Sequence, residues 1–178
     1  RRLNVVEAPD CGQECQGDVA VAGIPDDVGD LDGAGSSNAV ESAAYHYAAA
    51  LAHRPEFPEA HRSLGNPSLL RKDWPAAAGN YESALALEPD DPATHYALGD
   101  TYRKMSQFDK AAAQYREVLR INPQHLDTRI KLADSLAEAG HREDAIAAAR
   151  EALAMARAAK NDRLIAVLEA RLRDYEQP

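Results

Sequence analysis

The sequence is poor in aromatic residues and in long apolar runs. Aromatic side chains make up 6% of its 178 residues, with one tryptophan and two phenylalanines. Alanine is the commonest apolar residue, which suits helices that pack closely together. No run approaches the roughly 18 consecutive apolar residues that a membrane-spanning helix needs. We therefore expect a folded chain without membrane insertion.

Positive charge is also in short supply. Lys and Arg number 20 against 29 Asp and Glu, and this net charge of −9 argues against nucleic acid as a partner. Residues 1–37 alone carry a net charge of −6, are rich in Gly and Asp, and show no helical period. We expect them to form an acidic extended tail, because so polar a segment does not fold alone. The tail has no apolar stretch typical of a signal peptide, so the compartment, cytoplasmic or exported, stays unknown.

The two cysteines, Cys11 and Cys15, lie in this tail within the sequence CGQEC. A zinc site needs four ligands, and no second Cys pair or nearby His supplies them. Haem attachment needs Cys-x-x-Cys-His, which is absent. Two thiols without a role, a local disulfide in an exported protein and a metal site stay open, in that order of preference. We expect no cofactor and no metal.

Beyond the tail, a pattern recurs every 34 residues. The recurring residues are Ala43, Ala77, Ala111 and Ala145; Tyr47, Tyr81 and Tyr115; Leu51, Leu85, Leu119 and Leu153; Leu64, Leu98 and Leu132; and Pro55, Pro89 and Pro123. A fixed period of this length indicates an array of one stacked unit. Each unit has two stretches of helical spacing and ends at or near a proline, which does not continue a helix. The unit is therefore predicted to be a helical hairpin.

Small residues let the two helices of a unit approach closely. Gly99 has no side chain, and Tyr115 fills the wider gap further along the second helix. We expect the helical part to begin near residue 37 or 38 and Asp109 to cap the second helix of its unit. Pro67 lies in the middle of a predicted first helix, where proline costs about 3 kcal/mol or forces a kink. Either that helix bends or neighbouring contacts compensate.

These positions resemble the tetratricopeptide repeat, a 34-residue helix–turn–helix unit. The match is strongest at Leu98, Gly99, Tyr102, Phe108, Ala111, Tyr115 and Pro123. The resemblance implies an all-α fold, a right-handed α-α superhelix that follows the extended N-terminal tail at 1–37. The repeat domain at 38–178 would hold a half repeat at 39–55, repeats at 58–91, 92–125 and 126–157, and a capping helix at 162–176. On that last helix, Arg171 is expected to face water.

In this family the first helices of the repeats line a concave groove. The groove residues here would be Arg62, Asn66, Leu70, Tyr96, Asp100, Lys104, Ile130, Lys131 and Asp134, beside Glu59, Ser63, Ala93, Ala97, Asp127 and Glu138. Some members bind the C-terminal carboxylate of a chaperone, and Arg62, Asn66 and Lys131 resemble three residues of that site. Asp127 would repel a carboxylate, so we prefer another extended or helical peptide. The alternative is that these positions are simply exposed and polar.

No nucleophile–base pair, phosphate-binding loop or pair of carboxylates stands out, so we do not expect an enzyme. His61 and His95 occupy equivalent repeat positions, where a structural role is expected. Three functions follow in order of preference. The first is a non-catalytic scaffold or adaptor that binds a protein or peptide in the groove. The second is a structural subunit of a larger complex, held through its tail, and the third is a C-terminal fragment of an enzyme.

Overall fold

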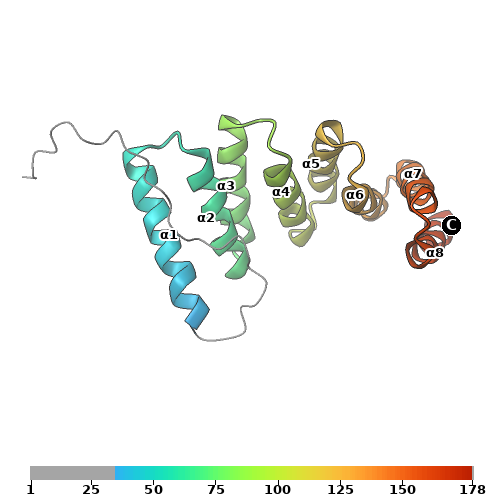
Figure 1. Ribbon diagram of the computed structural model, residues 1–178, viewed down its shortest axis with the longest axis horizontal. Coiled ribbons are helices and arrows are strands. Elements are labelled where there is room, and N and C mark those ends of the chain that lie inside the picture. Colours follow the sequence, from blue (N-terminus) through green and yellow to red (C-terminus); the bar gives the residue numbers. More distant parts are fainter. Residues whose placement is uncertain (1–34, 178) are drawn as a thin grey trace, which may run out of the picture. The chain divides into compact units, whose positions relative to one another are not determined.

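The computed structural model of the chain describes residues 35–177, which form eight α-helices and no strand (Figure 1). They are α1 (Gly35–His53), α2 (Pro58–Leu70), α3 (Trp74–Leu87), α4 (Pro92–Lys104), α5 (Phe108–Ile121), α6 (Leu126–Glu138), α7 (Arg142–Ala158) and α8 (Asp162–Glu176). From α2 to α8, each helix packs against the next one along the chain. The predicted all-α superhelix of paired helices is confirmed over these residues. Nearly all of the predicted tail, with Cys11 and Cys15, lies outside them.

Local signals in the sequence account for several helix starts. Asp73, Asp91 and Asn161 are N-caps, and each side chain accepts a hydrogen bond from a backbone N–H of the first turn. The prediction that Asp109 caps α5 is wrong, because Gln107 holds the N-cap position and makes no side-chain bond there. Asp109 lies in the first turn instead, where its carboxylate pairs with the His141 ring at 2.7 Å. The structure also starts α1 at Gly35, before the predicted start.

The first helix of each pair ends in the same left-handed turn. Lys72, Ser106 and Gly140 lie 34 residues apart and have φ angles of 58°, 56° and 86°. In each turn, backbone N–H groups reach back to carbonyls of the last helical turn, as in a Schellman motif. Only one of the three positions carries glycine, which adopts such angles without steric cost. The other two residues store backbone strain.

The cores of the first two full repeats each contain a glycine that faces a tyrosine. A Cβ added to Gly99 would lie 2.7 Å from the ring of Tyr115, which is fully buried. Gly65 stands in the same way against Tyr81. In the third repeat both partners change, because alanine takes the glycine position and Ala149 the tyrosine position. The two halves of the contact are therefore matched in size within each repeat.

Pro67 leaves α2 as one continuous helix and is itself buried. The equivalent residues of α4 and α6 are Thr101 and Ser135, and their hydroxyls donate to the carbonyl four residues earlier, at 2.7 and 2.8 Å. Side-chain bonds of this kind tend to bend a helix at that place. Proline at the same position removes the backbone donor to that carbonyl and favours a bend too. This place in the repeat therefore tolerates proline better than an ordinary helix interior.

The last described helix, α8, packs against α7. Its Leu168 and Leu172 are buried. Glu169 occupies the eighth helical position, which is Gly65 in α2 and Gly99 in α4, and it pairs with Arg157 at 2.8 Å. The expectation that Arg171 faces water is wrong, because its guanidinium binds Asp134.

At the other end, α1 packs much less closely. Its residues Ala43, Tyr47 and Ala50 repeat the positions of Ala77, Tyr81 and Ala84, which are buried in α3. On α1 none of the three is fully buried. The physical reason is that the described residues contain no first helix to pair with α1.

Candidate binding groove

The predicted groove residues lie on one set of helices, α2, α4 and α6, which we call the groove face. Leu70 and Lys104 occupy equivalent positions near the ends of α2 and α4, and both are exposed, with Leu70 at 60%. Asn66 is exposed as well. Ile130 is half-buried and packs against the core. The remaining members are half-buried and each makes polar contacts: Arg62, Tyr96, Asp100, Lys131 and Asp134.

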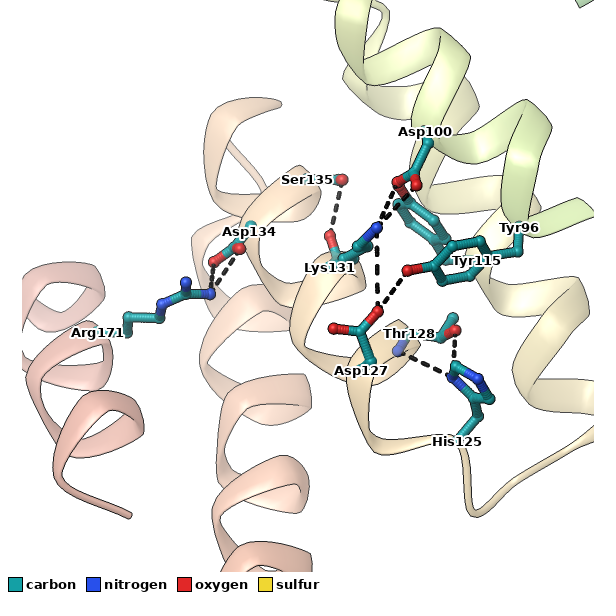
Figure 2. Close-up of polar contacts among 10 residues, drawn as sticks. All are labelled: Tyr96, Asp100, Tyr115, His125, Asp127, Thr128, Lys131, Asp134, Ser135 and Arg171. Atoms are coloured by element: carbon teal, nitrogen blue, oxygen red, sulfur yellow. Dashed lines mark hydrogen bonds and ion pairs between the residues drawn. The ribbon is translucent and has the colours of Figure 1, made fainter. Parts of the chain in front are cut away.

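The centre of the groove face is a network between α4 and α6 (Figure 2). The Lys131 ammonium donates to both carboxylate oxygens of Asp100, each at 2.8 Å, and lies 3.9 Å from Asp127. The same nitrogen stands 4.3 Å from the ring centre of Tyr96, a cation–π contact. The Tyr96 hydroxyl donates to Asp127 at 2.5 Å. Two helices of different repeats therefore hold the Tyr96 ring in one orientation.

The protonation states of this network are fixed by its neighbours. Burial, then the hydrogen bond to Asp127, raises the pKa of Tyr96, so its hydroxyl stays a donor at neutral pH. Burial by itself would lower the pKa of Lys131, but the bonds to Asp100 outweigh it and the pKa is raised. Lys131 is therefore charged at neutral pH.

A second regularity involves the ninth residue of each first helix: Asn66, Asp100 and Asp134. Each accepts a hydrogen bond from a tyrosine hydroxyl, from Tyr81 at 2.7 Å, Tyr115 at 2.5 Å and Tyr175 at 2.6 Å. The third tyrosine comes from α8, since α7 has alanine at the repeat position. Helix α8 therefore supplies the tyrosine hydroxyl that α7 lacks.

The charge at this ninth position follows the cation available. Asp100 pairs with Lys131, 31 residues later, and Asp134 binds Arg171 on α8 through both carboxylate oxygens at 2.6 Å (Figure 2). Asn66 has Ala97 at the spacing where Asp100 has its lysine. Asparagine is uncharged and needs no cation there. The carboxylates at the ninth position are thus paired with cations of the same chain.

Arg62 is also paired, with Asp91 at 2.8 Å. Asp91 is the N-cap of α4, and the Arg62 guanidinium and the Thr94 hydroxyl hold its pKa below the ordinary value although burial opposes this. Arg62 and Lys131 were the two cations that resembled a carboxylate-binding site. Both are held by acidic neighbours, so neither is a free cation for a C-terminal carboxylate.

One pocket opens beside this network, with a volume of about 520 Å³. It is lined by Pro92, Ala93, Tyr96, Val118, Asn122 and His125. The His125 ring stands edge-on to Tyr96, with 5.8 Å between ring centres. The sequence predicted Ala93 and Tyr96 as groove residues but gave no signal for the other four. Pro92 is the first residue of α4. The other three come from the end of α5 and the turn into α6, which the groove pattern of first helices does not include.

The expected structural role of His61 and His95 is consistent with their contacts. Their Nε2 atoms lie 3.0 and 2.9 Å from the carbonyls of Pro55 and Pro89, six residues earlier. Arg129 donates from the same repeat position to the carbonyl of Pro123 at 2.7 Å. The side chain thus fastens each first helix to the turn before it.

The described residues offer neither a metal site nor a membrane span. Within residues 35–177, no cluster of three or more His, Cys, Asp or Glu side chains could hold a metal ion. None of the described helices is long and apolar enough to cross a membrane.

Comparisons with known proteins agree with this geometry. The family described as tetratricopeptide repeat matches residues 34–92, and the family described as anaphase-promoting complex, cyclosome, subunit 3 matches residues 70–152. Together with the recurring helix pairs, the first match identifies the repeats of the described residues as tetratricopeptide repeats. Such repeats generally mediate protein–protein interactions, and the family is typically a non-catalytic scaffold.

Solved structures with a similar fold include two of MamA. One has a TM-score of 0.65 at 17% identity and covers 79% of this chain and 84% of that one; the other has 0.62 at 22%, with 66% and 64% covered. This chain thus spans just under two thirds of the latter. The Arabidopsis OM64 TPR domain has a TM-score of 0.56 at 19% identity, covering 66% of this chain and 95% of that domain. At these identities the likeness concerns the fold. No curated protein matches the sequence significantly.

Proposed function

We propose that this protein is a non-catalytic scaffold that binds a segment of a partner protein along the groove face of α2, α4 and α6. The observation that supports the proposal most directly is preorganisation. Tyr96 and Lys131 are held between two repeats by their contacts with Asp100 and Asp127. A surface whose side chains are already ordered loses less entropy when it binds.

The chemistry of the face indicates the kind of segment. Its charges are largely paired internally, so no strong single-sign field would select a highly charged ligand. Exposed Leu70, Lys104 and the partly exposed Tyr96 ring offer apolar, basic and aromatic contacts in turn. A segment of mixed composition, extended or helical, would complement them.

The test is selection of random twelve-residue peptides on the immobilised full chain, followed by binding measurements with variants. Leu70→Glu and Lys104→Glu change exposed groove-face residues and should leave helicity intact. Arg163→Ala changes an exposed residue of α8 and serves as the matched control. We expect the groove variants to weaken binding of the selected peptides at least about tenfold, equivalent to about 1.4 kcal/mol, and the control to have no effect. Failure to select any peptide, or equal binding by all variants, would contradict the proposal.

A further inference from the structure

We propose that the pocket beside Tyr96 and His125 takes an apolar side chain of the bound segment, and that Asp127 binds a Lys or Arg next to it. This inference rests on the proposed function and specifies its ligand. The pocket volume of about 520 Å³ exceeds what a leucine side chain needs, and Pro92, Ala93, Val118 and the Tyr96 ring give it apolar walls. Concave apolar sites with a few polar groups are typical of ligand pockets.

The comparison between repeats indicates why the pocket occurs here. In the preceding repeat, Arg62 stands where Tyr96 does and Asp91 where His125 does. Those two side chains pair with each other at 2.8 Å across the equivalent position. In the second repeat two aromatic rings replace the ion pair, and their edge-on contact leaves an apolar space beside them. The second repeat is therefore the place for an apolar anchor.

The hydrogen-bonding groups at the mouth of the pocket set the neighbouring chemistry. His125 Nδ1 accepts from the backbone N–H of Thr128 at 3.2 Å, so the ring proton of neutral His125 lies on Nε2. That Nε2–H has no partner among the described residues and can donate to a main-chain carbonyl of the segment. Asn122 lines the same pocket, and its Oδ1 accepts a hydrogen bond from the backbone N–H of Gln124.

Asp127 supplies the charge that selects a basic neighbour. Its side chain is 59% exposed, and its Oδ2 takes both the Tyr96 hydroxyl and the more distant Lys131 ammonium. Its Oδ1 has no partner among residues 35–177. Lys131 is closer to Asp100, at 2.8 Å, than to Asp127, at 3.9 Å. Lys131 therefore pairs mainly with Asp100, and the Asp127 carboxylate is available to an incoming cation. Charge complementarity with Asp127 favours Lys or Arg beside the anchor.

The experiment titrates the full chain with three capped dipeptides and follows amide chemical shifts. The probes are acetyl-Leu-Arg-amide, acetyl-Leu-Glu-amide and acetyl-Gly-Arg-amide. We expect acetyl-Leu-Arg-amide to shift the signals of Ala93, Tyr96 and His125 with a dissociation constant on the order of 1 mM. The other two probes lack the anchor or the cation and should bind at least about tenfold more weakly.

Two variants separate the two halves of the proposal. Ala93→Leu fills the pocket and should abolish the shifts, whereas Ala113→Leu, the same change at an exposed site of α5, should not. Asp127→Asn should remove the preference for Arg over Glu while leucine still binds. Shifts located elsewhere, no shifts at all, or equal affinities for the three probes would overturn the proposal.

The selected twelve-residue peptides distinguish this failure from failure of the proposed function. If they lose affinity with Leu70→Glu and Lys104→Glu but not with Ala93→Leu, the groove binds and the pocket assignment is wrong. If no peptide is selected yet acetyl-Leu-Arg-amide binds at Ala93, the pocket exists and the wider groove proposal is wrong.

Discussion

Replacing the core glycines by alanine tests the packing that holds each repeat together. In Gly99→Ala the new Cβ would lie 2.7 Å from Tyr115 Cε1, closer than carbon atoms tolerate. The Tyr115 ring is fully buried and its hydroxyl is bound to Asp100 at 2.5 Å, so it has no easy way to retreat. Overpacking of this kind costs about 1–3 kcal/mol of the free energy of unfolding.

A matched control exists in Gly79 on α3. A Cβ there meets nothing within 4 Å, so Gly79→Ala should stabilise the protein by the helix propensity of alanine, about 1 kcal/mol. The same propensity gain applies to Gly99→Ala, so the difference between the two variants isolates the overlap with Tyr115. We expect that difference to be about 1–3 kcal/mol.

The assay is urea denaturation followed by far-UV circular dichroism. Gly79→Ala should raise the midpoint, and Gly99→Ala should lie well below it. In the Gly99→Ala background, Tyr115→Ala should cost less than in the wild type, because it removes the overlap; the third repeat combines alanines in this way. Equal midpoints for the two glycine variants would refute the packing described here.

Three further predictions follow from the turns and the titrating groups. Ser106→Gly should stabilise the protein by up to about 1 kcal/mol and Gly140→Ala should destabilise it by about 1–2 kcal/mol in the same denaturation assay, because both positions have positive φ; the reverse order would contradict this. The lowered pKa of Asp91 contributes stability above its ordinary value of 3.8 that is lost as pH falls through the native pKa, so the stability advantage of the wild type over Asp91→Asn should shrink below that pH. Raised tyrosine pKa values contribute stability that is present below pH 10 and lost above it, so tyrosinate absorbance should rise at higher pH in the native protein than in urea. Burial is the first cause for Tyr81, Tyr96, Tyr102, Tyr115 and Tyr175, joined by an acidic neighbour in all but Tyr81. Coincident titration curves would show that these hydroxyls are not protected.

The fold was predictable because its signals are local and repeated. The 34-residue period, the small residue facing Tyr81 and Tyr115, and the Asp and Asn caps each act within one hairpin. Asp109 shows the limit of such reasoning. A carboxylate in the first turn of a helix resembles an N-cap in the sequence, but this one pairs with His141 of another repeat. Pro67 was ambiguous because the equivalent residues of α4 and α6, Thr101 and Ser135, place hydroxyl bonds at the same position of the helix, which the position of a proline alone does not indicate.

The chemistry of the groove face was less predictable. Its members follow from the repeat register, but their pairing joins residues 31 or 37 positions apart, through the way successive repeats stack. The sequence therefore suggested free cations at Arg62 and Lys131 and a solvent-facing Arg171, whereas the structure pairs all three. The pocket at His125 escaped prediction because it forms only where α4, α5 and the turn into α6 meet.

The measurement that tests the central claim most directly is amide chemical-shift mapping of the full chain with a selected twelve-residue peptide. If the groove face is the binding surface, the shifted signals should cluster on α2, α4 and α6, with Tyr96 and Lys131 among the largest. Shifts that cluster on the opposite helices α3, α5 and α7 would contradict the claim.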